Sequence, residues 1–182
     1  MNYNLLLLQH HTLESERLVL RPLTLDDAEA LYEFKSDEQT TRYIYEPHQD
    51  LTRTLNSMAN YYLKEPIGKY AVVLKETNKV IGIFEFRVHE HNKSGEIGYT
   101  LDSRYWGHGY MTEAGKRILE FAFNDLQLER VFAEHDTNNV ASGKVMQRLG
   151  MTCDGILRKS RMFKGELIDG AYYSILKSEY VK

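Results

Sequence analysis

The sequence lacks most of the features that mark secreted, membrane-spanning and nucleic-acid-binding proteins. Its single cysteine, Cys153, rules out an internal disulfide and fits a reducing, cytoplasmic setting. The longest early apolar run, residues 5–8, is too short to cross a bilayer and has no basic segment or cleavage pattern of a signal peptide. The net charge is only -3, and basic residues do not cluster with aromatic ones. Neither a nucleic acid nor a membrane is therefore an expected partner.

Internal repeats, low-complexity tracts and linker-like stretches are also missing. The 182 residues suffice for one domain with a full core, and their 42% hydrophobic and 27% charged content is ordinary for a globular protein. Residues 1–13 show no clear period, so we expect a tail or an extra edge segment there. We expect residues 14–182 to form a single domain.

The most informative stretch is residues 96–115, which predicts a strand, a glycine-containing turn and an amphipathic helix in that order. The strand alternates between two faces, with Ile97, Tyr99 and Leu101 on one and Glu96, Gly98 and Thr100 on the other. The turn holds Gly107 and Gly109. From Tyr110 onward, apolar residues recur at spacings of three and four, as on one face of a helix.

A glycine turn that leads into a helix is a suitable anion site. The first N–H groups of a helix have no internal partner, the helix dipole is positive there, and glycine allows a bulky phosphate to approach. Two common phosphate loops do not fit. Gly109 is followed by Tyr110 and Met111 instead of the Lys-Ser/Thr of a Walker loop, and Thr112 stands where a dinucleotide fingerprint has its third glycine.

The run Arg104-Tyr-Trp-Gly-His-Gly109 fits the pattern Arg/Gln-x-x-Gly-x-Gly instead. It resembles the loop that binds the acyl-CoA pyrophosphate in the GNAT superfamily of N-acetyltransferases. The longer run Tyr-Trp-Gly-x-Gly-Tyr-x-Thr-Glu-Ala resembles the branch of the ribosomal-protein N-terminal acetyltransferases, RimJ and RimL, as does the opening Ser-Glu-Arg-Leu-x-Leu-Arg-Pro-Leu. The alternative is an ordinary strand–turn–helix corner.

This resemblance implies an α+β fold with a mixed, mostly antiparallel, twisted sheet of about seven strands and about four flanking helices. The strands that carry Glu96 and Val131 would be parallel and would splay apart, with the cofactor wedged between them. The remaining segments agree with such a fold. They predict a first strand at residues 17–23, helices near 28–34, 51–64 and 140–149, a hairpin at 70–75 and 79–88, and two long strands within 151–177.

The resemblance also implies a set of acetyl-CoA contacts on the strand, the turn and a second helix. These are Tyr99, Thr100, Leu101, Arg104, Tyr105, Trp106, Gly107, His108, Gly109, Tyr110, Met111, Asn139 and Ser142. His108 departs from the pattern, because relatives often have Lys or Arg there. Ser142 heads the apolar stripe of its helix and is a candidate proton donor to the departing thiolate, unless it bonds a main-chain carbonyl instead.

Acetyl transfer to an amine also needs a base, because an alkyl amine is mostly protonated at neutral pH. Glu96 is the first candidate, although it could instead be an exposed partner of Arg87 or Lys93. Glu85, on a neighbouring strand, is the second candidate and a predicted substrate contact. In the family the first helical pair and its loop line the acceptor site, so Tyr43 and Tyr45 are expected either to contact the substrate or simply to pack.

The sequence therefore predicts an acetyl-CoA-dependent N-acetyltransferase that works by direct attack in a ternary complex, without a metal. The acceptor is a primary amine, with a protein N-terminus favoured over small amines, amino acids or polyamines. A CoA-binding module without turnover is the other class considered. Homodimer formation is left open.

Overall fold

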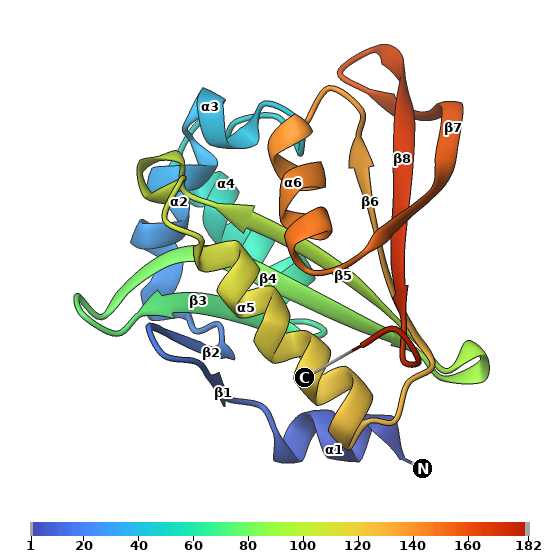
Figure 1. The fold of residues 1–182 in the computed structure, drawn as a ribbon. Coiled ribbons are helices and arrows are strands. Elements are labelled where there is room, and N and C mark those ends of the chain that lie inside the picture. The colour runs from blue at the N-terminus through green and yellow to red at the C-terminus, as the bar shows by residue number, and fades with distance from the viewer. Residues whose placement is uncertain (1, 181–182) are drawn as a thin grey trace.

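The computed structural model describes residues 2–180, whose strands form one sheet in the order β1-β2-β3-β4-β5-β6-β8-β7 (Figure 1). Neighbouring strands are antiparallel except for β5 and β6, which run parallel. The strands are β1 (Leu13–Glu14), β2 (Leu18–Pro22), β3 (Lys69–Leu74), β4 (Lys79–His89), β5 (Ser94–Leu101), β6 (Arg130–Asp136), β7 (Thr152–Phe163) and β8 (Glu166–Leu176).

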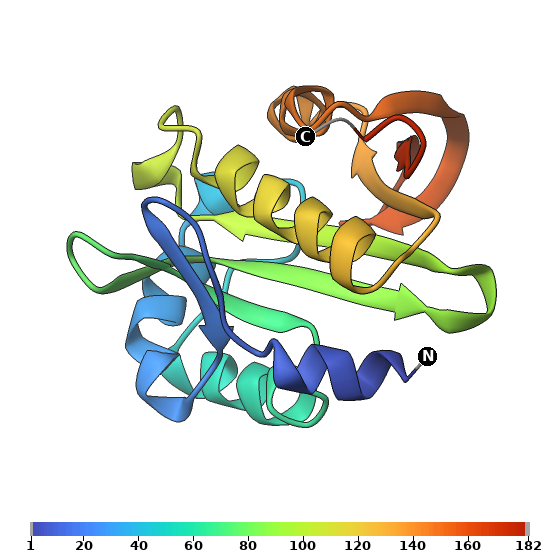
Figure 2. The same cartoon turned by 60° about the horizontal axis from the view of Figure 1, so that its bottom comes forward.

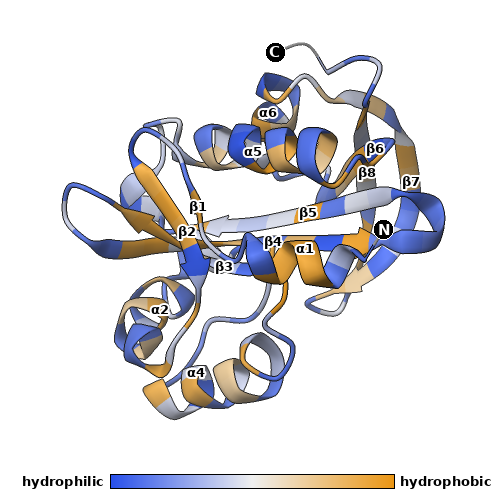
Figure 3. Cartoon of the chain, turned by 90° about the horizontal axis from the view of Figure 1, so that it is seen from below, coloured by the Kyte–Doolittle hydropathy of each residue, from blue (hydrophilic) through white to orange (hydrophobic). Residues whose placement is uncertain are grey.

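Helices cover both faces of this sheet. Helices α5 and α6 lie on one face and α2 and α4 on the other (Figures 2 and 3). The helices are α1 (Tyr3–Gln9), α2 (Ala28–Lys35), α3 (Glu38–Thr41), α4 (Leu51–Ser57), α5 (Tyr110–Glu120) and α6 (Val140–Arg148), and wider turns at Met58–Tyr62 and Phe121–Asp125 extend α4 and α5. None of the helices in the described part of the chain is long and apolar enough to cross a membrane.

The burial of the central strands follows from this layering. Every residue of β3 is buried, because its alternate side chains enter hydrophobic cores on both faces of the sheet. One core lies on the α5 side and includes Phe84, Ile97 and Ile118. The other lies beneath α2 and α4 and includes Phe34 and Ile83. The sheet therefore separates two compartments, and its strand alternation decides which side chains enter each one.

The predicted fold class is confirmed: the sheet is mixed and mostly antiparallel, with one parallel pair. The small difference in element number comes from short segments that carry little periodic signal, such as β1 and α3. Residues 1–13, expected to be a tail or an extra edge segment, contain the helix Tyr3–Gln9, which Asn2 caps and which the sequence did not predict. The division into residues 1–13 and 14–182 stays a prediction, and residues 1, 181 and 182 lie outside the described residues.

Candidate active site

Strands β5 and β6 separate along their length. They pair only where Ser94–Glu96 lies beside Arg130–Phe132. Beyond that point β5 stays paired with β4, and β6 follows β8 (Figure 1). The predicted splay is present, and it opens a gap beside the last residues of β5.

The gap exposes backbone donors of β5. The N–H of Asp102 donates to Ile81 of β4 at 2.9 Å, and on the opposite edge the carbonyl of Lys93 accepts from Glu129 at 2.8 Å. Because the hydrogen-bonding groups of a strand alternate between its two edges, the N–H groups of Tyr99 and Leu101 face the gap. No residue of β6 pairs with Tyr99 or Leu101, because β5 and β6 are paired only at Ser94–Glu96.

The glycine turn lies at the end of the same strand. Gly107 and Gly109 have φ angles of +82° and +80°, a region that favours glycine. A Cβ added at Gly107 would meet no atom within 4 Å, and one at Gly109 only a guanidinium nitrogen of Arg17 at 3.8 Å. The side chains of Tyr110 and Met111 are buried, so these two residues offer only backbone N–H groups at the start of α5. The turn is therefore an open concavity beside unpaired helix donors, which fits an anion of pyrophosphate size.

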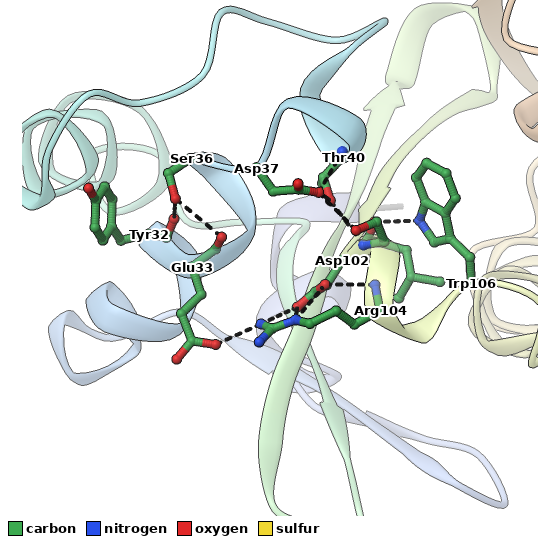
Figure 4. A network of polar contacts seen from close by, with 10 residues as sticks. Tyr32, Glu33, Ser36, Asp37, Thr40, Asp102, Arg104 and Trp106 are labelled. Carbon is green, nitrogen blue, oxygen red and sulfur yellow. Dashed lines mark hydrogen bonds and ion pairs between the residues drawn. The ribbon is translucent and has the colours of Figure 1, made fainter.

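Arg104 turns its charge away from this concavity. Its guanidinium contacts Asp102 and Glu33 at 2.6 Å each, which raises its pKa, and so ties the turn to α2 (Figure 4). Next to it, Trp106 donates its indole N–H to the carbonyl of Leu101 at 2.8 Å. The side-chain contacts of Arg104 give no support to its predicted role in pyrophosphate binding, which stays a prediction.

Arg17 brings a positive charge to the turn that the sequence did not predict. Its guanidinium lies 4.5 Å from the centre of the Tyr110 ring and bonds Glu113 at 2.7 Å. His108 also stacks on Tyr110, with ring centres 5.6 Å apart. The guanidinium of Arg17 therefore lies beside Gly109, paired with the carboxylate of Glu113.

Tyr99 and Ser142 form a hydroxyl pair between β5 and α6. Ser142 Oγ donates to Tyr99 Oη at 3.1 Å, and the tyrosine hydroxyl donates to the Ser142 carbonyl at 3.0 Å. Asn139 accepts from the N–H of Ser142 at 3.2 Å and so caps α6. Burial raises the pKa of Tyr99 to about 12, so this hydroxyl keeps its proton at neutral pH. Ser142 does not use its hydroxyl on a main-chain carbonyl.

A pocket of about 570 Å³ lies on the other face, among α2, α4 and the sheet. Of the predicted residues it contains Tyr45, Glu85 and Thr100, whereas Tyr43 is not among its lining residues and lies over Arg42 instead. Its full lining is Lys35, Ile44, Tyr45, His48, Arg53, Asn56, Ser57, Tyr61, Tyr62, Glu85 and Thr100. Thr100 also belongs to the end of β5, so this pocket adjoins the strand that borders the gap.

The two candidate carboxylates differ in position. Glu85 lines the pocket, where it bonds Tyr61 and Arg87 at 2.6 Å each. It pairs across the sheet with Gly98, beside which an added Cβ would meet no atom within 4 Å. Glu96 is not part of the pocket lining and contacts Arg87 at 3.2 Å and His89 at 3.4 Å. The structure therefore brings Glu85, rather than Glu96, to the pocket.

Comparison with known proteins decides the family. Residues 17–152, well over half of the chain, match the family model described as acetyltransferase (GNAT) domain.

The chain belongs to the GNAT acetyltransferases.

Two curated relatives match over almost their whole length. The uncharacterized N-acetyltransferase p20 of Bacillus licheniformis is 35% identical over 174 residues, covering 93% of this chain and 98% of p20. The uncharacterized N-acetyltransferase YnaD of Bacillus subtilis is 30% identical over 167 residues, covering 91% and 97%. A GNAT-family acetyltransferase from Bacillus anthracis has a similar solved structure, with a TM-score of 0.83, 29% identity, and coverage of 92% of this chain and 99% of that one. The chain is thus an acyltransferase of the N-acetyltransferase type.

Sequence reasoning missed part of this GNAT site. Lys35 and His48 are buried polar residues of the pocket that were not predicted. A signal for Lys35 was present, because it lies four residues after Leu31 and seven after Ala28, on the buried face of α2. His48 lies in an irregular loop and gave no such signal. Within residues 2–180 no three His, Cys, Asp or Glu side chains gather as a metal site would require, and the expectation of no metal stays a prediction.

Proposed function

We propose that this chain moves an acetyl group from acetyl-CoA to a primary amine by direct attack in a ternary complex, with a protein N-terminal α-amine as the favoured acceptor. One observation carries the proposal: the lined pocket and the glycine turn both reach the carboxyl end of β5, where Thr100 lines the pocket and Ser103–Tyr105 opens the turn. An acceptor and a CoA thioester could therefore meet beside one strand.

The residues of the turn and α6 would hold acetyl-CoA, which supplies the activated acetyl thioester when bound. Gly107, Gly109 and the first N–H groups of α5 offer room and donors for its pyrophosphate. The N–H groups of Tyr99 and Leu101 are placed to donate to the oxygen that gains charge during acyl transfer. Tyr99, paired with Ser142, keeps a proton that it can donate to the leaving sulfur. A solved structural neighbour, the microcin C7 self-immunity acetyltransferase MccE, contains acetyl-CoA and AMP, and at 21% identity it supports the fold alone.

Glu85 is the base that we favour. It lies in the acceptor pocket, and the open space beside Gly98 leaves room for a substrate or a water between the carboxylate and the gap. Arg87 contacts both carboxylates, so the difference is one of position: Glu96, the first candidate from the sequence, lies outside the pocket lining.

The protein N-terminus is favoured by the RimJ/RimL-type turn and by a partial relative. YdaF of Bacillus subtilis, named as a candidate ribosomal N-acetyltransferase, is 34% identical over 89 residues, about half of each chain. Small amines remain the second acceptor class, because the spermidine N(1)-acetyltransferase of Escherichia coli is 20% identical over 163 residues.

We also propose a cytoplasmic setting from the single cysteine. The edge strand β7 exposes Ile156, Leu157 and Met162, which favours a homodimer.

The test is CoA thiol release with a panel of peptides that have free N-termini and a panel of small amines. We expect Glu85→Gln to lower kcat by about a hundredfold, because general base catalysis contributes roughly that much or more. The matched variant Glu96→Gln should keep most of the turnover. A larger loss in Glu96→Gln would move the base to Glu96, and acetyl-CoA binding without thiol release for any amine would make the chain a CoA-binding module.

A further inference from the structure

Lys35 is the least expected side chain of the acceptor pocket. It ends α2, and only 2% of its surface is exposed, yet it lines the pocket. A lysine is rarely buried to this degree unless it is paired with a charge, because the ammonium loses its hydration. The contacts of Lys35 therefore indicate its role.

The contacts of Lys35 leave its charge without a counter-ion. Its Nζ donates to Tyr62 Oη at 3.1 Å and lies 4.2 Å from the centre of the Tyr45 ring and 5.0 Å from that of Tyr62. Across residues 2–180, Lys35 forms no ion pair with a carboxylate, although the charge of Glu85 is near enough to raise the pKa of Lys35. An ammonium has three donors, and the hydrogen bond to Tyr62 uses one of them. The contacts with the two rings are attractions between a charge and a ring face, so donors remain available to a ligand.

The rest of the pocket does not cancel this charge. Glu85 is the one carboxylate among its lining residues, and it is already paired with Arg87 at 2.6 Å. Arg53 adds a second cation to the lining. His48 bonds Thr54 at 2.8 Å, and burial together with Lys35 and Arg53 lowers its pKa to about 4, so it is neutral at neutral pH. The pocket thus carries a net positive charge.

A second polar group of the pocket is also incompletely satisfied. The hydroxyl of Tyr45 is buried and, among the described residues, no group meets it in full hydrogen-bond geometry, although Thr100 lies near enough to interact with it. An anion bound beside Lys35 would accept from the ammonium and lie within the same aromatic walls. A polyamine would instead bring further positive charge to a site whose single carboxylate is already paired.

We propose that the pocket takes an amine acceptor that also bears a carboxylate, with Lys35 as the residue that binds this carboxylate. This inference rests on the proposed function and names its substrate class. The carboxylate lies against Lys35, and the amine lies toward Glu85 and the gap beside β5. Two sources share this chemistry: the α-carboxylate of a free amino acid, and the acidic side chain of the first residue of a peptide.

The experiment compares acceptors that differ only in charge. One arm measures kcat/KM by thiol release for L-aspartate, L-serine, L-leucine and L-tyrosine against their carboxamides. The other arm compares the tripeptide amides Asp-Ala-Ala and Asn-Ala-Ala, in which the side chain carries the sole carboxylate. We expect at least about tenfold preference for the carboxylate in one arm, and that arm identifies the source.

Variants link the preference to Lys35. Lys35→Met should reduce the preference to near one, and Lys35→Arg should keep part of it because the charge remains. Lys79→Met, at an exposed position on β4, should leave it unchanged. If Lys35→Met does not fold, Lys35→Gln takes its place. Absence of any preference in the wild type, or its persistence without the ammonium, would overturn the proposal.

A binding readout separates this proposal from the proposed function. Calorimetry in the presence of CoA compares N-acetyl-aspartate with its diamide, which needs no turnover. Tighter binding of the acid in the wild type, lost in Lys35→Met, supports the anion site even if no amine is acetylated. Equal binding of acid and diamide by both proteins refutes it even if amines are acetylated.

Discussion

At the scale of a single residue, Lys35 shows how a side chain placed for binding opposes stability. Burial lowers the pKa of Lys35 from 10.5 to about 8, and the charge of Glu85 only partly offsets this. The folded protein therefore binds fewer protons than the unfolded chain between these two pKa values. Because the unfolded state holds more protons there, the free energy of unfolding rises with pH across this window. Below pH 8 both states are protonated and the full cost of the buried charge remains.

We therefore expect pH to change the stability of the wild type relative to Lys35→Met. Between pH 7 and pH 9.5 the free energy of unfolding of the wild type should rise by about 2 kcal/mol relative to that of the variant, since the buried ammonium loses its proton only in the folded state. The measurement is urea denaturation of both proteins at the two pH values. The difference in free energy of unfolding between the wild type and Lys79→Met should be the same at both pH values, because the side chain of Lys79 is exposed to water. A constant difference for Lys35→Met as well would show that its ammonium is not buried as described.

Residue-level prediction succeeded where strand alternation decides the answer. The alternation of residues 96–101 correctly separated Tyr99 from Thr100, and these two side chains now serve opposite faces of the sheet. It could not choose between Glu96 and Glu85, because that choice depends on where α2 and α4 cover the sheet. Lys35 was missed because a lysine on a helix is usually solvated, and only its tertiary surroundings bury it.

At the scale of elements, the turn and α5 were predictable because their signals are local. Glycines with positive φ, free helix N–H groups and an apolar stripe all lie within one short stretch of chain. The splay of β5 and β6 is different, since it arises from long-range pairing of β6 with β8. Only the family resemblance predicted it. Helix α1 was missed because seven residues give too few turns for a periodic pattern.

Helix α1 offers an element-scale prediction. Leu7 is 4% exposed and belongs to the core on the α5 side, whereas its neighbour Leu8 is 54% exposed. Leu7→Ala should lower the free energy of unfolding by about 2–4 kcal/mol, and Leu8→Ala by less than about 0.5 kcal/mol. Equilibrium denaturation measures both. Equal, small effects would mean that α1 is not packed against the domain in solution.

At the scale of the whole molecule, one sheet lies between the glycine turn and the pocket, and both reach the end of β5. The glycine turn, Tyr99 and Ser142 lie on the side where α5 and α6 pack, and the pocket with Glu85 lies beneath α2 and α4. Arg104 crosses between them, linking the turn to Glu33 of α2 (Figure 4). This arrangement suits a reaction in which both substrates are bound before transfer occurs.

The most direct measurement of this account is a calorimetric titration of acetyl-CoA into the wild type, Gly107→Val and Gly165→Val. Both glycines have a φ of +82° and open surroundings, so both substitutions carry similar backbone strain. Only Gly107 lies in the glycine turn that is predicted to bind the pyrophosphate. We expect the wild type and Gly165→Val to bind alike and Gly107→Val to bind at least about tenfold more weakly, because its side chain would occupy the space for the pyrophosphate. Unchanged affinity in a folded Gly107→Val protein, or no binding by the wild type, would contradict the account.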